Sequence, residues 1–316
     1  NGNESRTLYL RAKNEGSITC YSDAVTAVLR KPLVSTSGTL SSFSNCEGTA
    51  ATEQSFTVTG QYLTNDLTVN APTGFEVSAT SGSGYGSSIT LTPTDGSVSA
   101  TVYVQIPSTT SSGSLSDDIT CASVHNLNGS STSASETVQA SGTIAAAPTI
   151  TTAADLTTAA NTCGQTELEI SHSGTGGSGE WTYSGGNVAF TVGSSTDATV
   201  SVSPNSSDVN TDITMTWTVA SGQVCDGATA SKVIHFNQPT SVASPDTYTY
   251  LWGGLTSTDI ATGSNWYKWD ATNGMWARQS SAPNASTDKL HVLTTDNNCI
   301  HSTNSLTLGT ATLASL

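Results

Sequence analysis

The sequence predicts an all-β protein built from sandwich domains in a row, and three observations support this. Short stretches alternate between apolar and polar residues, as between Ser55 and Thr59, where Phe56 and Val58 share one face. Alternation over about four to six residues is typical of a strand with one buried face. Turn residues separate these stretches, and a helical period is nearly absent. A chain of 316 residues is long for one domain and suits roughly three or four sandwiches.

Charge is scarce and unevenly placed. Charged residues make up 10% of the chain, the net charge is −15, and no Lys or Arg occurs between Pro32 and Ser231. Nucleic-acid binding needs a basic footprint, so the sequence argues against it and also against docking on anionic lipid. No apolar run is long enough to span a membrane. We therefore expect neither a nucleic-acid partner nor insertion into a membrane.

Cysteine usage indicates an oxidising compartment. The six cysteines form no C-x-x-C pair and have no histidine at metal-site spacing, which disfavours zinc. Wide spacing on predicted strands favours disulfides, which are typical of exported proteins. The first and last residues fall inside what look like domains. We expect a piece of a larger extracellular protein, and the pairing of Cys20 and Cys299 stays open.

The first predicted segment, residues 1–31, reads as a β-hairpin. One strand covers Arg6 to Ala12 and the next covers Ala24 to Arg30. The run from Tyr9 to Ala12 resembles the penultimate strand of fibronectin type III and immunoglobulin-like domains, in which the aromatic packs between two sheets. Two strands cannot bury a core alone, so this hairpin is expected to close a preceding sandwich.

Residues 33–144 are predicted to form a complete sandwich, with a polar loop over residues 124–135. Cys46 lies near its start and Cys121 follows a predicted strand. A bond between them would close a loop of about 75 residues, worth roughly 4 kcal/mol in the chain-entropy model. The alternative is two buried free thiols.

Residues 148–238 are predicted to form a second, immunoglobulin-like or PKD-like sandwich. Its landmarks are Cys163, Trp181, Trp217 and Cys225. A core tryptophan between two cysteines is the immunoglobulin-like arrangement, in which the indole packs against a disulfide that crosses between the sheets. Both tryptophans are expected in the core, with a sugar-stacking surface as the alternative.

Residues 239–245 resemble a linker, and an aromatic-rich, truncated β module is predicted over residues 246–316. Aromatic side chains stack on sugar faces and supply large contact areas. A small β module with few aliphatic residues also needs aromatics for its core, so a glycan platform and a core remain alternatives. The four candidates for glycan binding are Trp252, Trp266, Trp269 and Trp276.

No catalytic constellation is recognisable, and we expect no enzyme and no cofactor. The chain has no nucleophile-elbow motif, and its five histidines are scattered. The Asp117–Asp118 pair and the loop from Asp208 to Asp212 could offer oxygens to a structural calcium ion. Neither has the spacing of a calcium loop, so solvated turns are favoured.

The central sandwich resembles a repeat of giant surface adhesins that Bacteroidota export through the type 9 secretion system, of which the gliding-motility adhesins of the SprB type are the best known. The matching stretches are Glu53–Gly60, Leu63–Thr64, Leu67–Val69, Ala71–Ser78, Ile89–Pro93 and Ser141–Thr143. Residues 148–238 are similar to immunoglobulin-like or PKD-like modules of the same proteins. The series Trp252-Gly253, Asn265-Trp266, Ala282-Pro283 and Thr287-Asp288 is similar to their module that precedes a β-solenoid-like stretch.

This resemblance implies tandem sandwiches attached to the outer membrane, with the type 9 secretion machinery as a partner. The preferred hypothesis is a structural and adhesive segment of a cell-surface adhesin, which spaces and presents binding surfaces in gliding motility or surface attachment. Two alternatives are the carbohydrate-binding accessory region of a secreted multidomain hydrolase and a self-assembling surface filament, in which edge strands of successive copies would pair.

Overall fold

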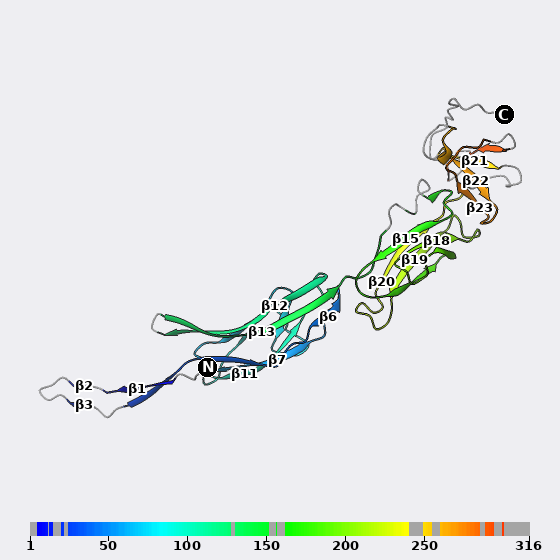
Figure 1. The fold of residues 1–316 in the computed structure, drawn as a ribbon. Helices are drawn as coiled ribbons and strands as arrows, with labels where there is room; N and C mark the ends of the chain where they lie inside the picture. Colours follow the sequence, from blue (N-terminus) through cyan, green and yellow to red (C-terminus); the bar gives the residue numbers. More distant parts are fainter. Residues whose placement is uncertain are drawn as a thin grey trace. The chain divides into compact units, whose positions relative to one another are not determined.

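The computed structural model describes residues 5–11, 13–14, 20–21, 25–127, 130–151, 156, 162–239, 249–254, 260–284, 288–293 and 299. The chain divides into two compact units, Asn1–Ala146 and Ala147–Leu316, called here the first and the second unit. Strands dominate both units (Figure 1), so the predicted all-β class is confirmed. The predicted linker over residues 239–245 lies outside the described residues, apart from Pro239.

The N-terminal segment forms the predicted hairpin. Strand β1 (Ser5–Leu10) pairs antiparallel with β4 (Val25–Arg30), and β2 (Lys13–Asn14) pairs with β3 (Cys20–Tyr21). Among the described residues, β1 and β4 form a sheet of two strands with no other member. Tyr9 is 72% exposed in this hairpin, and the expectation that the hairpin closes a preceding sandwich stays a prediction. A two-stranded ribbon without a second layer has no interior in which to bury an aromatic ring.

The rest of the first unit is a two-layer sandwich of the immunoglobulin-like kind. One sheet has the order β5-β7-β11-β9 and the other has the order β10-β8-β12-β13-β6. The strands are β5 (Leu33–Ser37), β6 (Phe43–Cys46), β7 (Gln54–Gln61), β8 (Leu67–Asn70), β9 (Glu76–Ser78), β10 (Ser88–Leu91), β11 (Val98–Gln105), β12 (Gly113–Leu127) and β13 (Ser130–Ala145).

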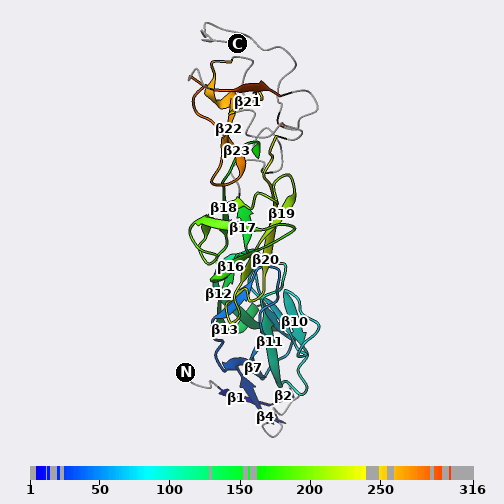
Figure 2. The ribbon, with the colours of Figure 1, turned by 90° about the vertical axis from the view of Figure 1, so that its right-hand side faces the viewer.

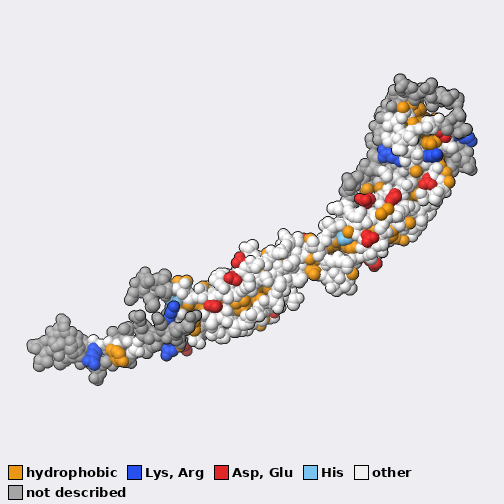
Figure 3. Space-filling model, in the orientation of Figure 1, with side chains coloured by type: hydrophobic (Ala, Val, Ile, Leu, Met, Phe, Trp, Pro, Cys, Tyr) orange, Lys and Arg blue, Asp and Glu red, His pale blue; other side chains and the backbone are white. Residues whose placement is uncertain are grey.

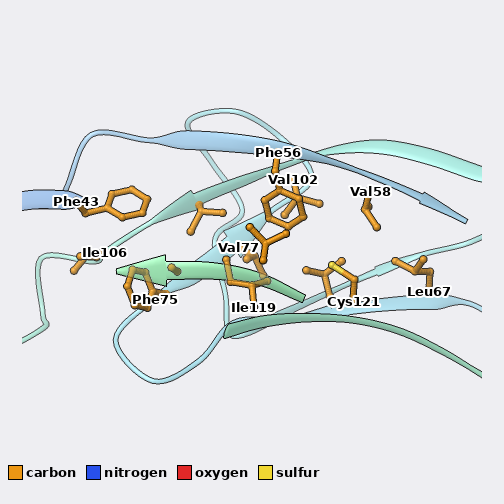
Figure 4. Packing of buried hydrophobic residues seen from close by; sticks show 14 of the residues in the cluster. Phe43, Phe56, Val58, Leu67, Phe75, Val77, Val102, Ile106, Ile119 and Cys121 are labelled. Atoms are coloured by element: carbon orange, nitrogen blue, oxygen red, sulfur yellow. The ribbon is translucent and has the colours of Figure 1, made fainter. Parts of the chain in front are cut away.

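The core between these sheets follows the alternation in the sequence. Phe56 and Val58 of β7 point toward Ile119 and Cys121 of β12 (Figure 4). Successive side chains of a strand point to opposite faces, so the polar residues between them reach solvent. Strand β12 continues to Leu127 and β13 begins at Ser130, so the predicted polar loop over residues 124–135 is mostly strand. Serine and threonine occupy strand positions there because the long hairpin keeps the pairing register.

The first strand of this sandwich is divided between the two sheets. Strand β5 pairs antiparallel with β7, whereas β6 pairs parallel with the last strand, β13. Each part is the outermost strand of its sheet, so β5 covers the edge of β7 and β6 covers the edge of β13. Gly142 of β13 lies opposite Phe43 of β6. A Cβ at Gly142 would lie 2.7 Å from Ile106 Cδ1 and 3.1 Å from Phe43 Cβ.

Gly142→Val is therefore expected to lower the free energy of unfolding of the first unit by about 1–3 kcal/mol through overpacking. Denaturant unfolding, with hydrogen exchange of β13 to assign the transition, measures this change. Thr143→Val is the matched control, because Thr143 is the exposed neighbour on the same strand. Equal stabilities of the two variants would contradict the close β6–β13 packing.

The second unit begins with a seven-stranded sandwich. One sheet has the order β14-β15-β18-β17 and the other has the order β16-β19-β20, which is the strand plan of a constant-type immunoglobulin domain. The strands are β14 (Thr149–Thr151), β15 (Leu168–Ser173), β16 (Gly179–Ser184), β17 (Val188–Val192), β18 (Thr199–Pro204), β19 (Asp212–Val219) and β20 (Thr229–His235).

A four-stranded sheet of order β23-β22-β21-β24 follows, and Figure 2 shows β21, β22 and β23. Its members are β21 (Tyr250–Trp252), β22 (Trp266–Asp270), β23 (Met275–Arg278) and β24 (Leu290–Val292), with a 3-10 turn η1 (Gly263–Asn265) before β22. We call this the aromatic sheet. Strands β21 and β24 are parallel, and the others are antiparallel. Residues 300–316, toward the predicted solenoid, lie outside the described part of the chain.

Candidate functional site

The four tryptophans proposed for glycan binding belong mainly to the core. Trp252 is 6% exposed, Trp266 is 1% exposed and Trp276 is 5% exposed, while Trp269 is half-buried. A stacking platform needs an accessible ring face, which the three buried indoles do not offer. The platform interpretation is wrong for these three residues, and the alternative, a core, describes them.

The aromatic sheet is apolar on both faces. One face carries Trp252 and Trp266, which pack with Ile260, and the Nε1–H of Trp266 donates to the Ile260 carbonyl at 2.7 Å. The other face carries Tyr267 and Trp276. A sheet with two apolar faces needs cover on each side, and the sandwich of the same unit supplies it on the second face.

The cover of the second face contains a disulfide bond between Cys163 and Cys299, whose Cα atoms are 5.7 Å apart. Both cysteines have 0% exposure and pack against Leu251, Tyr267 and Trp276. The hydroxyl of Tyr267 donates to the Cys299 carbonyl at 3.2 Å, and burial raises the pKa of Tyr267 above its usual range. The bond therefore joins the segment before β15 to the segment after β24, across a sequence separation of 136.

Gly164 brings the sandwich backbone against the aromatic sheet. Its φ is +65°, and a Cβ there would lie 2.3 Å from the Tyr267 ring. Its carbonyl accepts a hydrogen bond from the Arg278 N–H at 2.7 Å, and the Gln238 Oε1 accepts one from the Trp276 N–H at 2.7 Å. The sandwich thus satisfies two N–H groups of β23 that an edge strand would otherwise leave open.

Buried polar side chains complete this junction. The Asn237 Nδ2–H donates to the Thr162 hydroxyl, and the Asn237 carbonyl accepts from the Gly164 N–H at 2.9 Å. The Gln238 N–H donates to Asn210 Oδ1 at 2.8 Å. Directional bonds between buried groups fix one arrangement, because any displacement would leave polar atoms unsatisfied. We call the disulfide and these hydrogen bonds the clamp.

The predicted disulfide pairings are wrong. Cys163 bonds to Cys299 instead of Cys225, which lies in the turn between β19 and β20. Cys163 lies near Asn237, beyond the other end of β20, so the length of a seven-residue strand separates the two sites. Cys46 and Cys225 are themselves disulfide-bonded. Neither Cys163 nor Cys225 lies on a strand, unlike the cysteines of an immunoglobulin domain.

Cys121 is a buried free thiol, so it forms no bond with Cys46. In the strand register, Cys46 lies opposite Ala145 of β13 and Cys121 lies opposite Glu136 of β13. These two positions are nine residues apart along β13, which corresponds to about 30 Å. A disulfide needs Cα atoms within about 7 Å. A disulfide between Cys46 and Cys121 is therefore wrong, and the alternative, a buried free thiol, describes Cys121 but not Cys46.

Cys121 is expected to resist alkylation in the folded protein. Burial raises the pKa of its thiol to about 11, with a smaller contribution from Glu136. Since the thiolate is the reactive form, iodoacetamide at pH 8 is expected to modify Cys121 only after the first unit unfolds. Mass spectrometry with and without denaturant measures this. Modification at the rate of a free cysteine without denaturant would contradict the burial.

An aromatic stack takes the position of the cross-sheet disulfide in the second sandwich. His172 of β15 and Trp217 of β19 stack with ring centroids 3.6 Å apart, and Trp181 of β16 lies edge-on at 5.5 Å from Trp217. Strands β15 and β19 belong to opposite sheets and correspond to the strands that carry the two immunoglobulin cysteines. The expectation that both tryptophans lie in the core is confirmed, with a histidine in place of the disulfide.

The stack is expected to weaken at acid pH. Burial lowers the pKa of His172, although a hydrogen bond with the backbone of Ser173 opposes this. A depressed folded-state pKa means that the stabilisation is complete above the unfolded value, near 6.5, and is lost as pH falls through the folded value. The free energy of unfolding of the second unit should therefore fall less in His172→Gln than in the wild type as the pH falls from about 7 to about 5. Denaturant midpoints across this range measure it, and parallel pH profiles would contradict it.

Two further histidines, His125 and His235, lie next to polar side chains. His125 Nδ1 lies 2.7 Å from the Thr64 hydroxyl, and burial lowers the pKa of His125. His235 Nδ1 lies 2.9 Å from Asp212. Within the described ranges, no group of three or more His, Cys, Asp or Glu side chains could hold a metal ion. Nor does that part of the chain contain a helix with the length and apolarity for crossing a membrane.

The surface offers a polar depression and few charges. The depression lies over β8 and β12 and is lined by Thr64, Asn65, Asp66, Thr68, Asn70, Ala122 and Val124. On the face drawn in Figure 3, charged side chains of the described residues are few and scattered. Sequence reasoning missed the clamp residues Gly164, Asn237 and Gln238. Only the even number of cysteines hinted that Cys299 has a partner.

Comparison with known proteins finds tandem immunoglobulin-like structures at low similarity. No family model matches, and no curated protein matches. The mouse nectin-like molecule 4 ectodomain is 14% identical at a TM-score of 0.29, over 67% of this chain and 66% of its own length. Titin domains I67–I69 are 11% identical at 0.31, over 71% and 72%. A Porphyromonas gingivalis W83 protein of unknown function is 9% identical at 0.24, over 64% and 99%. These scores carry no argument, so the fold rests on the sheet topology described above.

Proposed function

We propose that this chain is a structural and adhesive segment of a large extracellular adhesin, in which it spaces and presents binding surfaces. The observation that carries the proposal is that two immunoglobulin-like sandwiches follow one another along the chain and that the second is joined by a disulfide bond to a further sheet. A buried disulfide fits an oxidising, extracellular location. Attachment to the outer membrane through the type 9 secretion machinery, and a role in gliding motility, are parts of the proposal that rest on the sequence resemblance alone.

The strand plan of the first sandwich suits a spacer under tension. Strands β6 and β13 are parallel, with Phe43 opposite Gly142 and Cys46 opposite Ala145. A pull on the chain before β6 and after β13 slides these strands past each other, which loads their hydrogen bonds together. By contrast, the same pull opens the β1–β4 hairpin one pair at a time, starting at Ser5 and Arg30.

The adhesive part of the proposal is assigned to the polar depression over β8 and β12. Its lining contains the exposed polar side chains of Asp66 and Asn70 beside the apolar surface of Val124, which is 50% exposed. Amide, carboxylate and hydroxyl groups around a small apolar area suit a neutral, hydroxyl-rich ligand such as a glycan. Burial of Trp252, Trp266 and Trp276 removes most of the support that the sequence gave to a hydrolase accessory region.

Surface display tests this function. The whole chain is placed on a non-adherent bacterium through an unrelated anchor, and attachment to surfaces coated with neutral polysaccharides is measured. We expect attachment above that of cells with the anchor alone, and its loss with Asp66→Ala plus Asn70→Ala. Ser99→Ala plus Thr101→Ala is the matched control, because both residues are exposed on the other sheet. Attachment equal to the anchor alone would overturn the adhesive part and leave a spacer.

A further inference from the structure

Strand β13 has a long edge that no other described strand covers. On one side it pairs along its length with β12 (Figure 1), while on the other side β6 covers it only from Gly142 to Ala145. The stretch from Ser130 to Ser141 therefore has a strand neighbour on the β12 side alone. We propose that this edge pairs antiparallel with the same edge of a second copy of the chain. The inference goes beyond the proposed function, which assigns no role to contacts between copies.

The backbone groups along this edge point outward at every second residue. The Glu47 N–H donates to the Ala145 carbonyl at 2.9 Å, so the backbone groups of Ala145 face away from β12. The register of β12 and β13 has no shift, and the backbone groups of successive residues alternate between the two sides of a strand. The residues whose N–H and C=O groups point outward are therefore the odd-numbered ones: Ser133, Ser135, Thr137 and Gln139. Within the described part of the chain, these outward groups have no hydrogen-bond partner.

This edge lacks most of the features that keep natural strand edges apart, which are lysine, proline, β-bulges and short length. The stretch from Ser130 to Ser141 contains no Lys, Arg or Pro, and its pairing with β12 has no bulge. Several other outer strands are protected. Strands β9, β10, β14 and β24 have three or four residues, β17 has an irregular register after Phe190, and β20 carries Lys232. An added strand therefore fits β13 better than it fits those edges.

A second copy of β13 is self-complementary with this edge. Antiparallel pairing with Ser135 on a two-fold axis places Ser133 of one copy opposite Thr137 of the other. These three side chains are exposed, and cross-strand pairs of hydroxyl side chains are favourable. Glu136, the one charged residue of the stretch, then lies opposite Ala134 and not opposite itself. A contact that uses the same patch on both copies closes after two copies, so it gives a dimer and no filament.

The charge of the chain also favours this edge as the place where two copies meet. Two chains of net charge −15 repel each other wherever their acidic groups come close. Asp117 and Asp118 lie on β12, and in the paired sheet the two β12 strands are three strand spacings apart, about 14 Å. This distance exceeds the screening length of about 8 Å at physiological ionic strength. An edge with a single charge offers little to a strongly charged partner and fits a strand as uncharged as itself.

Cysteine crosslinking of the whole chain tests the pairing. Two residues that exchange both backbone hydrogen bonds have Cα atoms about 5.5 Å apart, which suits a disulfide. Ser135→Cys should therefore form a covalent dimer under mild oxidation. Ser116→Cys is the matched control, because Ser116 is an exposed serine on β12, one strand away from the edge. Cys121 is buried and does not compete. Equal amounts of covalent dimer in the two variants would overturn the proposal.

Sedimentation equilibrium supplies a second test. The edge is a small interface, so the average mass of the wild type should rise from 32.2 kDa toward twice that value only at high protein concentration. Ser135→Pro removes one outward N–H and leaves the hydrogen bonds to β12 in place, so it should stay monomeric. Ser135→Ala keeps this N–H and should behave as the wild type.

Should the proline variant fail to fold, Ser135→Lys replaces it, because two lysines would lie opposite each other on the axis and keep the copies apart. A dimer that persists in the folded proline or lysine variant would overturn the proposal. A wild type that stays monomeric at every concentration would also overturn it, and would leave the edge to an extended segment of another protein.

Discussion

Replacing both Cys163 and Cys299 by alanine is expected to lower the free energy of unfolding of the second unit by about 5 kcal/mol. The bond closes a loop with a sequence separation of 136, and a crosslink of that span removes much conformational freedom from the unfolded chain. Denaturant unfolding, with hydrogen exchange in β15, β19 and β22 to assign the transition, measures the change.

The matched control for this variant is Cys121→Ala. Cys121 is as buried as the two clamp cysteines but is a free thiol, so its replacement removes no crosslink. We expect that variant to leave the second unit unchanged. A loss below about 1 kcal/mol in the double variant would mean that the hydrogen bonds of the clamp hold the aromatic sheet without the covalent link.

Trp217→Ala is expected to cost about 3–5 kcal/mol in the stability of the second unit. The Trp217 side chain is 2% exposed and lies between His172 and Trp181, so alanine would leave a cavity where the two sheets meet. In this sandwich the aromatic stack bridges the sheets at the strands where a disulfide does so in an immunoglobulin domain. Denaturant unfolding, followed by hydrogen exchange in β19, checks the expected loss.

Trp217→Phe separates packing from polarity at the same site. The Trp217 Nε1–H is buried without a hydrogen-bond partner among the described residues, so phenylalanine removes an unsatisfied donor while it keeps most of the ring. We expect a cost well below that of alanine. Equal instability of the two variants would contradict a cost that is set by the size of the cavity.

The strands were predictable because their signal is local. Along β7, the apolar residues Phe56 and Val58 alternate with polar neighbours. Because successive side chains of a strand point to opposite faces, this alternation is enough to give the strand one buried face. The same reasoning failed at residues 124–135, where serine and threonine suggested a loop. Pairing with the opposite strand of a long hairpin outweighed their turn preference there.

The aromatic sheet shows where composition stops being informative. The density of tryptophan in residues 246–316 is equally compatible with a platform and with a core. The decision depends on whether both faces of that sheet are covered, and the cover comes partly from Cys163 and Gly164, about a hundred residues earlier in the chain. No local pattern around Trp266 or Trp276 carries that information.

The sequence by itself determined the all-β class, most strands and the buried face of each, because the pleat acts over neighbouring residues. Only the tertiary structure decided the cysteine partners and the junction of the second unit. Cys163 lies at one end of the sandwich and Cys225 at the other, and that separation follows from how seven strands are ordered in two sheets. A disulfide forms between residues that the fold brings within a few ångströms, and distance along the chain does not report that proximity.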